Sequence, residues 1–350
     1  MTFTGPRNAP GVVDVVALGE SMVTFLPSRP GRLADVPSFE RAIGGAESNV
    51  ACELAAAGHR VRWVSRVGAD GFGDHLVETI GGHGVDVTAV RRDPARPTGV
   101  YFRTAGDRGT DAHEVAYYRA GSAASAMSAE NVDLAAVRAG RVLHLSGITA
   151  ALSGTCLGLL RELTAPREDR PLVSFDVNHR PGLWRDPGGP AVLLDLARAA
   201  DLVFVGVDEA QDAWGVTGGP EAIRAALPEP PLLVVKDGPR GATAFDHARR
   251  PAVHVPAPEV RVAAATGAGD AFAAGFLHAS LRGLPLRDRL RHGHLWAAAT
   301  LTSPADLAAP PARDTADALV ALDDAGWEKL RLGPGRTHPA DRADEEVPTP

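Results

Sequence analysis

Short runs of β-branched and other apolar residues recur along the chain, with helix-like stretches between them. Each run has the length of a strand, and together they are VVDVVALG (12–19), VRWVSRVG (61–68), RVLHLSG (141–147), PLVSFDV (171–177), DLVFVGV (201–207) and PLLVVKDG (231–238). Neighbouring parallel strands must be joined by a crossover, which is usually a helix. The alternation therefore predicts βαβ units around a parallel sheet, an α/β fold.

Two helices and one irregular region stand out from this rhythm. The stretches ESNVACELAAAG (47–58) and GAGDAFAAGFLHASLRG (267–283) predict helices that end at glycine. Residues 21–27, and residues 98–105 with 113–120, are strand-like but break the alternation, and the turn-forming GDRGTD lies between the last two. We expect these strands to form hairpins outside the main sheet, as a lid over a site.

The two ends of the chain have a different composition from its middle. Residues 1–11 predict a short flexible arm, and the proline-rich, acidic residues 331–350 predict a disordered tail. Residues 12–330 are expected to form a single domain.

Charge and composition exclude several partners. The chain has 36 basic and 43 acidic residues and a formal net charge of -7, which disfavours nucleic acid and anionic membranes as partners. No apolar run approaches the roughly 18 residues of a membrane span. Cys52 and Cys156 match no metal-binding spacing and are expected to be buried, reduced residues. These features favour a cytoplasmic enzyme.

Several common enzyme motifs are missing from the sequence. It contains no G-x-x-x-x-G-K-[ST] and no G-x-G-x-x-G, which argues against a P-loop NTPase and a nicotinamide dehydrogenase. It also lacks H-E-x-x-H and G-x-S-x-G, so zinc protease and serine hydrolase readings have no support.

The segment ATGAGDAFAAG (265–275) carries the clearest chemistry. Gly267, Ala268 and Gly269 stand at the start of a predicted helix, where unpaired N–H groups and the helix dipole attract anions. Asp270, in the same first turn, would face that anion and accept a proton from an attacking hydroxyl. Taken alone, the segment is also compatible with a simple helix cap and a tight turn.

A second glycine cluster gives this segment its context. IGGAESNVACELAAAG (43–58) contains Gly44 and Gly45, which permit close backbone approach to a ligand, and Asn49 one turn into the next helix. With GADGFGDHL (68–76) and A-T-G-A-G-D-A-F in this order, the chain from about residue 13 to about residue 310 resembles the ribokinase-like (PfkB-type) sugar kinases.

That resemblance implies a fold and a mechanism. The fold is a ribokinase-like three-layer α/β/α sandwich with a mainly parallel central sheet and a small β lid, here formed by about residues 21–42 and 97–121. Asp270 would be the general base, and the backbone of residues 267–269 would stabilise the phosphoryl group of ATP with Mg²⁺ bridging its oxygens. Exposed lid strands in this family often pair between subunits, which implies a possible homo-oligomer.

Three further segments resemble the branch of this family that phosphorylates 2-keto-3-deoxygluconate. They are YYRAGSAAS (117–125), HLSGITAALS (144–153) and FDVNHRPGLW (175–184). The substrate is a carboxylate, which a guanidinium binds in a fixed orientation. The resemblance implies the following substrate-binding residues: Gly44, Gly45, Asn49, Tyr101, Tyr117, Arg119, Arg180 and Asp270. Without the flanking matches, Tyr117 reads as a lid core aromatic and Arg180 as a surface arginine.

The nucleotide side is predicted in the same way. Glu209, within VFVGVDEAQDAWG, corresponds to an acidic residue that orders magnesium-bound water, although an exposed helix glutamate is an equal alternative. Lys236, for which the alternative is a strand residue with no contact to ATP, is included among the implied nucleotide-binding residues and is not predicted to be catalytic. These are Lys236, Gly238, Gly241, Thr266, Gly267, Gly269 and His294.

Some positions depart from the family pattern. Ala264 and Ala265 replace an acidic residue and a threonine or proline, which puts monovalent-cation activation in doubt. Gly206 and His294 stand where many relatives have asparagine, and His179 has no assigned role. These departures leave the metal and adenine contacts open.

The predicted function is ATP-dependent phosphorylation of 2-keto-3-deoxygluconate at its terminal C6 hydroxyl, in sugar-acid catabolism. The alternatives are a kinase for 2-keto-3-deoxygalactonate, fructose or ribose, and a non-catalytic pseudokinase that senses a sugar. The paired arginines favour an acid over a neutral sugar, and Asp270 with its glycines favours an enzyme over a sensor.

Overall fold

A large, mainly parallel sheet forms the centre of the protein. The computed structural model describes residues 11–104, 114–168, 170–184, 189–247, 249–264, 266–303 and 307–333. The sheet has the order β14-β13-β12-β11-β10-β9-β1-β4, in which β13 and β14 run antiparallel to their neighbours and the other strands are parallel. Its strands are β1 (Val13–Leu18), β4 (Val61–Val64), β9 (Gly140–Ser146), β10 (Leu172–Asp176), β11 (Leu202–Gly206), β12 (Leu232–Lys236), β13 (Ala242–Asp246) and β14 (Arg249–Val255).

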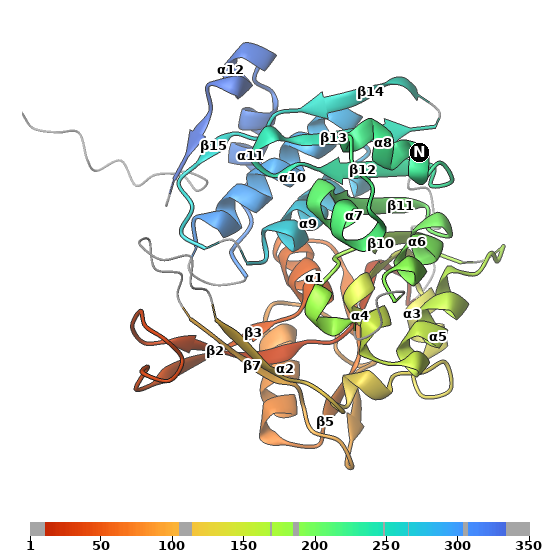
Figure 1. Ribbon diagram of the computed structural model, residues 1–350, viewed down its shortest axis with the longest axis vertical. Helices are drawn as coiled ribbons and strands as arrows, with labels where there is room; N and C mark the ends of the chain where they lie inside the picture. Colours follow the sequence, from red (N-terminus) through yellow and green to blue (C-terminus); the bar gives the residue numbers. More distant parts are fainter. Residues whose placement is uncertain are drawn as a thin grey trace, which may run out of the picture.

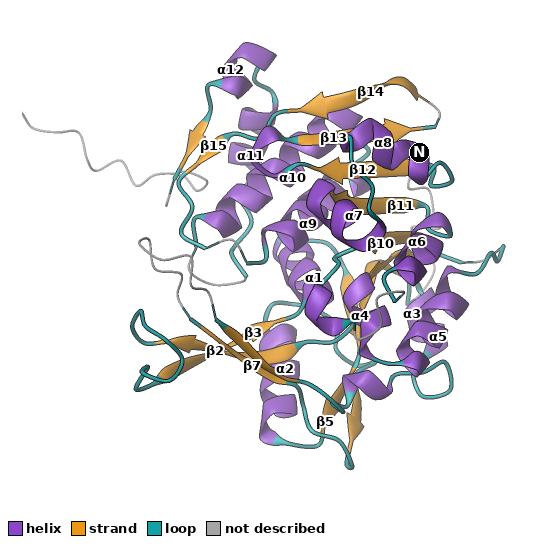
Figure 2. Ribbon diagram, in the orientation of Figure 1, coloured by secondary structure: helices purple, strands orange, loops and turns teal. Residues whose placement is uncertain are grey.

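Helices cover both faces of this sheet, as Figure 2 shows. Side chains alternate between the faces along each strand: Val15 and Val234 belong to one hydrophobic cluster, and Val16 and Val235 to the other. The first cluster contains residues of α1 (Ala46–Ala56), α2 (Gly71–Gly82), α9 (Ala268–Leu281), α10 (Leu286–Leu301), α11 (Arg313–Val320) and α12 (Asp324–Glu328). The second contains residues of α3 (Leu134–Arg138), α4 (Gly147–Leu152), α5 (Gly154–Thr164), α6 (Ala191–Arg198), α7 (Val207–Trp214) and α8 (Gly219–Ala226). The predicted three-layer α/β/α architecture is confirmed.

A second, smaller sheet projects from one end of this body (Figure 1). Its order is β3-β2-β7-β8, and it is built from β2 (Met22–Pro27), β3 (Phe39–Gly44), β7 (Val100–Arg103) and β8 (Val115–Tyr118). Phe25 stacks on Phe102 with ring centroids 4.6 Å apart, and Phe39 meets Phe102 edge-on at 5.2 Å. The two strand-like regions that broke the alternation therefore fold together, away from the main sheet.

Two predicted boundaries are wrong. The run 61–68 is not one strand, because Arg66–Gly68 forms β5, which leaves the main sheet and pairs with β6 (Arg91–Asp93). The predicted disordered tail also starts too early. Residues Arg331–Leu332 form β16, which pairs with β15 (Glu259–Val260), and Leu332 is buried. Residues 1–10 and 334–350 of the predicted arm and tail lie outside the described residues.

The predicted helices 47–58 and 267–283 correspond to α1 and α9, with ends that differ by one or two residues. Three short 3-10 turns, η1 (Ala124–Ala126), η2 (Pro181–Leu183) and η3 (Gly238–Arg240), complete the described elements. Cys52 and Cys156 are free and buried, as expected. Within the described ranges, no helix has both the length and the apolar character needed to cross a membrane.

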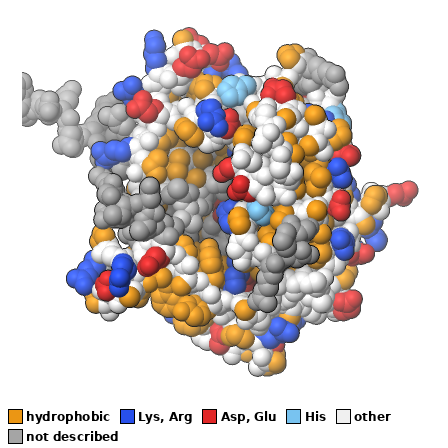
Figure 3. All heavy atoms as spheres, in the orientation of Figure 1, with side chains coloured by type: hydrophobic (Ala, Val, Ile, Leu, Met, Phe, Trp, Pro, Cys, Tyr) orange, Lys and Arg blue, Asp and Glu red, His pale blue; other side chains and the backbone are white. Residues whose placement is uncertain are grey.

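The strand order determines where a ligand can bind. β1 pairs with β4 on one side and with β9 on the other, so the order of the parallel strands reverses at β1. In open parallel sheets, ligands bind beyond the carboxyl ends of the strands near such a reversal. The small sheet follows directly from the carboxyl end of β1, and the surface is hollowed between the small sheet and the main body (Figure 3).

Candidate active site

The amino end of α9 carries the predicted anion site. Gly267 precedes the helix with φ 82°, a left-handed conformation that glycine adopts without strain. No side chain among the described residues caps this helix end. The first N–H groups of a helix have no intrahelical partners, so they remain available for an anion. A Cβ atom added at Gly269 would lie 3.5 Å from Lys236 Nζ, which brings a cation to the same place.

Asp270 lies in the first turn of α9 and faces α1. Asn49 Nδ2 donates a hydrogen bond to Asp270 Oδ2 over 2.9 Å, so the two glycine-rich motifs, 221 residues apart, meet here. Burial raises the pKa of Asp270 to about 7 and the nearby Asp176 adds to the rise, while the Asn49 hydrogen bond opposes it. A carboxylate with a pKa near neutrality is suited to accept a proton from a hydroxyl.

An ion pair that sequence reasoning missed lies beside Asp270. Asp176 ends β10 and Lys236 ends β12, and Lys236 Nζ is 3.1 and 3.0 Å from the two carboxylate oxygens. Burial alone would lower the pKa of Lys236, but the Asp176 and Glu209 carboxylates outweigh it and raise that pKa. The sequence held one signal of this pair, since both residues are polar and end apolar runs of parallel strands, β10 and β12, which flank β11.

Glu209 stands in the first turn of α7, immediately after β11. Its Oε2 accepts a hydrogen bond of 2.7 Å from Gly206 N, and its Oε1 lies 3.7 Å from Arg180 Nη1. Burial raises the pKa of Glu209, Lys236 opposes the rise, and Asp176 adds to it. Glu209 is therefore part of the same charged group as Asp176, Lys236 and Asp270.

The two predicted arginines have different surroundings. Arg180 follows β10, its side chain is 53% exposed, and its charge acts on Asp270. Arg119 follows β8 and forms an ion pair with the buried Glu20, whose other oxygen accepts from Ser122 Oγ. Arg180 is thus open to a ligand, whereas the charge of Arg119 is already compensated within the protein.

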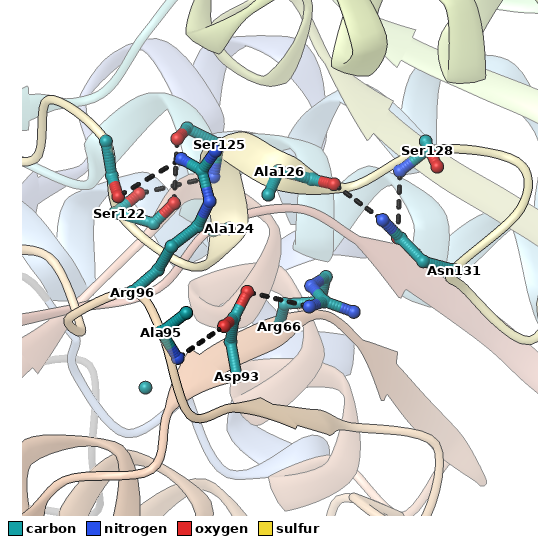
Figure 4. A network of polar contacts seen from close by, with 12 residues as sticks. Arg66, Asp93, Ala95, Arg96, Ser122, Ala124, Ser125, Ala126, Ser128 and Asn131 are labelled. Atoms are coloured by element: carbon teal, nitrogen blue, oxygen red, sulfur yellow. Dashed lines mark hydrogen bonds and ion pairs between the residues drawn. The ribbon is translucent and has the colours of Figure 1, made fainter.

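The segment after β8 is anchored by its own polar contacts, seen in Figure 4. Ser125 N donates to Ser122 Oγ, and Asn131 Nδ2 donates to Ala126 O. In the same view, Arg66 Nη2 pairs with Asp93 Oδ2 at 2.7 Å between β5 and β6. The contacts of Ser122, Ser125, Ala126 and Asn131 fix the chain that leads from the small sheet back to β9, and the Arg66–Asp93 pair fixes the adjacent β5 and β6.

The aromatic residues of the small sheet lie next to Arg119. Tyr101 is buried on β7, Tyr117 is half-exposed on β8, and their ring centroids are 5.4 Å apart. The Arg119 guanidinium lies 5.9 Å from the centroid of the Tyr117 ring. The predicted substrate residues therefore form two groups: Tyr101, Tyr117 and Arg119 at the small sheet, and Asn49, Arg180 and Asp270 at the strand ends.

At two of the glycines that were predicted to approach a ligand, close contacts within the protein itself require a glycine. A Cβ at Gly45 would lie 2.5 Å from Glu20 O, so the chain after β1 needs a glycine here. A Cβ at Gly241 would lie 2.3 Å from Val255 O, on β14. Gly44 ends β3 opposite Met22, and Gly238 begins η3. The approach that was expected from a ligand at Gly45 and Gly241 is made by the protein's own backbone.

His294 and His179 point into the protein. His294 is buried, its Nε2 lies 3.1 Å from Val255 O, and its ring packs edge-on against Phe272 at 5.2 Å. This packing accounts for the burial of His294, and its nucleotide contact stays a prediction. His179 is also buried, and it follows Asn178, which has a φ of 41°. Strained backbone of this kind is often found at functional sites.

The loop before α9 is only partly described. Thr266 is exposed, and Ala264 N donates to Leu301 O over 3.3 Å. Ala265 lies outside the described residues, so the departure noted at this position has no structural account.

Comparisons with known proteins agree with this geometry. The family model for pfkB family carbohydrate kinases matches residues 13–313. The chain is 34% identical over 289 residues to the 2-dehydro-3-deoxygluconokinase of Thermoproteus tenax, covering 82% of this chain and 87% of that protein. It is 33% identical over 310 residues to the enzyme of the same name from Bacillus subtilis, covering 86% and 94%. 

A solved structure supports the same assignment. The PfkB protein from Polaromonas sp. JS666 is 34% identical, with a TM-score of 0.76 over 84% of this chain and 97% of that one. The matched region contains the whole main sheet, the small sheet and the helix that carries Asp270. This chain belongs to the pfkB family of carbohydrate kinases and is a sugar kinase.

Proposed function

We propose that the protein transfers the terminal phosphoryl group of ATP to the C6 hydroxyl of 2-keto-3-deoxygluconate. The observation that carries this proposal is the position of Asp270, a carboxylate with a pKa of about 7 in the first turn of an uncapped helix end. A base and an anion-binding backbone within one helical turn are what transfer of a phosphoryl group to a hydroxyl requires.

In the proposed reaction, Asp270 accepts the proton of the sugar hydroxyl as the hydroxyl oxygen bonds to the γ-phosphorus. The bond from that phosphorus to the bridging oxygen breaks, and ADP leaves with the electron pair. Asn49 holds the Asp270 carboxylate through its hydrogen bond, so one oxygen remains for the substrate. The N–H groups at Gly267, Ala268 and Gly269 stabilise the charge on the phosphoryl oxygens.

Mg²⁺ fits this site as an ion that arrives with the nucleotide. The described residues include no group of three or more His, Cys, Asp and Glu side chains arranged to hold a metal. Nucleotide-bound Mg²⁺ needs only one or two protein carboxylates. Glu209 can contribute through water, whereas both oxygens of Asp176 accept from Lys236. When bound, the ion neutralises phosphate charge, and nothing else in the mechanism depends on it.

The substrate carboxylate is assigned to Arg180. Its guanidinium is exposed, lies after β10, and is close enough to Asp270 to affect its charge. An acid with a terminal hydroxyl would thus place its carboxylate and its reacting group around the same strand ends. We further propose that the small sheet acts as a lid, with Tyr101 and Tyr117 over the sugar, which limits hydrolysis of ATP by water.

A coupled assay of ADP release tests this function. The acceptors are 2-keto-3-deoxygluconate, 2-keto-3-deoxygalactonate, 2-keto-gluconate, fructose and ribose, each with MgATP. We expect selective activity on the keto-deoxy acids. Activity on fructose or ribose alone would remove the carboxylate assignment and retain Asp270 as the base, and no activity on any acceptor would favour the sensing alternative.

A further inference from the structure

The Asp176–Lys236 ion pair is placed where its charges can affect bound phosphate. The Asp176 side chain is 3% exposed, and the Lys236 side chain is 18% exposed. β11 lies between β10 and β12, so the ion pair bridges across the carboxyl end of β11. Glu209 follows directly after β11 on the chain. Both charged groups therefore lie at the carboxyl edge of the sheet, beneath the amino end of α9.

Stability alone gives little reason for such a pair. Removing two charges from water costs free energy that their attraction often fails to recover, and an apolar pair is commonly as stable. The rest of β12, Leu232–Val235, is fully buried and apolar. Gly269 lies next to Lys236, since a Cβ atom there would be 3.5 Å from Nζ. A ligand bound to the backbone at Gly269 would meet the ammonium group.

A second ion pair, at the opposite edge of the same sheet, provides an internal contrast. Arg170 and Asp201 precede β10 and β11, and Arg170 Nη2 lies 3.0 Å from Asp201 Oδ1. Asp201 also accepts from Val173 N, which ties it to the strand beside it. This pair is at the amino ends of the strands, the edge opposite to the proposed site. The Arg170–Asp201 pair is therefore expected to have only a structural role, and it serves as a control for the Asp176–Lys236 pair.

The Asp176–Lys236 pair also acts on the base. Asp176 raises the pKa of Asp270 and Lys236 lowers it, although burial has the largest effect. The charged or titratable groups that interact with Asp270 are Glu53 from α1, Asp176 and Arg180 from β10 and the loop after it, and Lys236 from β12. Glu209 from α7 interacts in turn with Asp176 and Lys236. Asp176 and Lys236 therefore shift the pKa of Asp270 in opposite directions.

We propose that Asp176 is a positioning residue that holds the Lys236 ammonium beside Gly269, where this ammonium binds the phosphoryl group that the enzyme transfers. The inference rests on the proposed kinase function. Lys236 stays protonated throughout: the hydroxyl proton moves to Asp270, the P–O bond to ADP breaks, and the ammonium neutralises charge on the phosphoryl oxygens. A lysine side chain has four rotatable bonds, so a fixed carboxylate is needed to keep its amine in one place.

Three variants separate this role from a structural one: Asp176→Asn, Lys236→Met and the control Asp201→Asn. We expect kcat to fall about 100-fold in Lys236→Met, as for loss of one donor to the transition state, and about 10-fold in Asp176→Asn. The control should keep kcat within twofold of the unchanged protein, about 0.4 kcal/mol at most. Thermal melting checks that each variant folds.

The pH profile of kcat/KM gives the readout that a structural role would not change. Activity falls as Asp270 is protonated, so its acid limb follows the pKa of Asp270. Asp176→Asn removes a negative charge and should move this limb to lower pH. Lys236→Met removes a positive charge and should move it to higher pH. Shifts in the same direction, or shifts equal to those of Asp201→Asn, would overturn the inference.

Nucleotide binding distinguishes failure of this inference from failure of the proposed function. Calorimetry with MgATP and no sugar requires no knowledge of the acceptor. Affinity lower by about 10-fold or more in Lys236→Met and Asp176→Asn, with Asp201→Asn unchanged, supports the inference even if no acceptor in the panel reacts. Unchanged affinity and unchanged kcat in both variants reject it while leaving the kinase assignment intact.

Discussion

Each end of α9 carries a buried titratable residue, and burial shifts the two pKa values in opposite directions. At the amino end, Asp270 has a pKa raised to about 7 and faces Asn49, Lys236 and a surface that a ligand can reach. At the carboxyl end, His278 is buried against His59, with Nε2 of His59 and Nδ1 of His278 2.9 Å apart. Burial lowers the pKa of His278 to about 3, and His59 and His292 add to this effect.

The contrast shows why a shifted pKa alone does not identify a catalytic group. A helix favours anions at its amino end and cations at its carboxyl end, yet burial opposes the charged form at both ends of α9. The Asp270 end opens toward the carboxyl edge of the sheet. The His278 end is enclosed by Trp296, with ring centroids 5.2 Å apart, and by the Arg282–Asp317 ion pair. Access to a ligand therefore separates the end with the proposed catalytic base from the packed end.

The largest expected effect is at the amino end. Asp270→Asn keeps the shape of the side chain and removes the base, so kcat should fall about 10³-fold. Sugar affinity should change much less, because the base acts mainly in the transition state. Steady-state kinetics on the best acceptor, with calorimetry for sugar binding, measure both. Retention of a tenth or more of the activity would contradict the role of Asp270.

Arg180→Ala tests whether Arg180, near the amino end of α9, recognises the carboxylate of the substrate. Loss of the charged partner should lower kcat/KM for the keto-deoxy acid by about 10- to 100-fold, since charge-assisted hydrogen bonds contribute about 1.5–3 kcal/mol. Activity on a neutral sugar should change less than threefold, within about 0.7 kcal/mol. The ratio of the two kcat/KM values is the measurement. Equal losses on both acceptors would show that Arg180 supports the site without recognising a carboxylate.

Much of the architecture could be predicted because its signals are local. The apolar runs marked all the parallel strands of the main sheet, and a glycine-rich segment followed by Asp270 marked the amino end of α9. The run 61–68 was misassigned because its apolar pattern continues through Ser65, whereas Arg66 turns to pair with Asp93. Hydrogen-bond partners far along the chain decided that boundary, and the sequence pattern does not contain them.

The site was predicted less completely than the fold, for the same reason. Asp176 and Lys236 are 60 residues apart and meet only because β10 and β12 flank β11. Glu20 and Arg119 likewise pair through the small sheet. The glycine at position 45 signalled a close approach, but only the structure identifies the approaching atoms as Glu20 O and Ser21 Cα. Residue types indicate which contacts are possible, and the packing of distant segments selects among them.

The pH dependence of stability should differ in sign between the two ends. The pKa of Asp270 is raised from 3.8 to about 7, so the folded state holds this proton more tightly, and the stability that it contributes is lost as pH rises from about 4 to 7. The pKa values of His278 and His292 are lowered from 6.5 to about 3 and about 4. Their contribution is present above pH 6.5 and is lost as pH falls below it.

Thermal melting between pH 5 and 8 can separate these contributions. Relative to the unchanged protein, Asp270→Asn should melt at higher temperature at pH 8, and this advantage should shrink toward pH 5. In Asp270→Asn, which lacks the opposing contribution of this carboxyl group, stability should fall from pH 6.5 to pH 5 as the buried histidines resist protonation. If Asp270→Asn melted lower than the unchanged protein at pH 8, the carboxylate would be stabilising the fold, and the contrast between the helix ends would fail.

The smallest effect is expected at the packed end, with His292→Leu. His292 is 1% exposed, neither ring nitrogen has a hydrogen-bond partner within the described part of the chain, and Nε2 is 3.5 Å from Asp317 Oδ1. An apolar side chain removes an unsatisfied polar group, so the free energy of unfolding at pH 8 should change by about 1 kcal/mol or less. The loss of stability toward pH 5 should become shallower, and kcat should be unchanged. A large fall in kcat with normal melting would mean that the two ends of α9 are coupled, and that the carboxyl end is more than a packed support for Asp270.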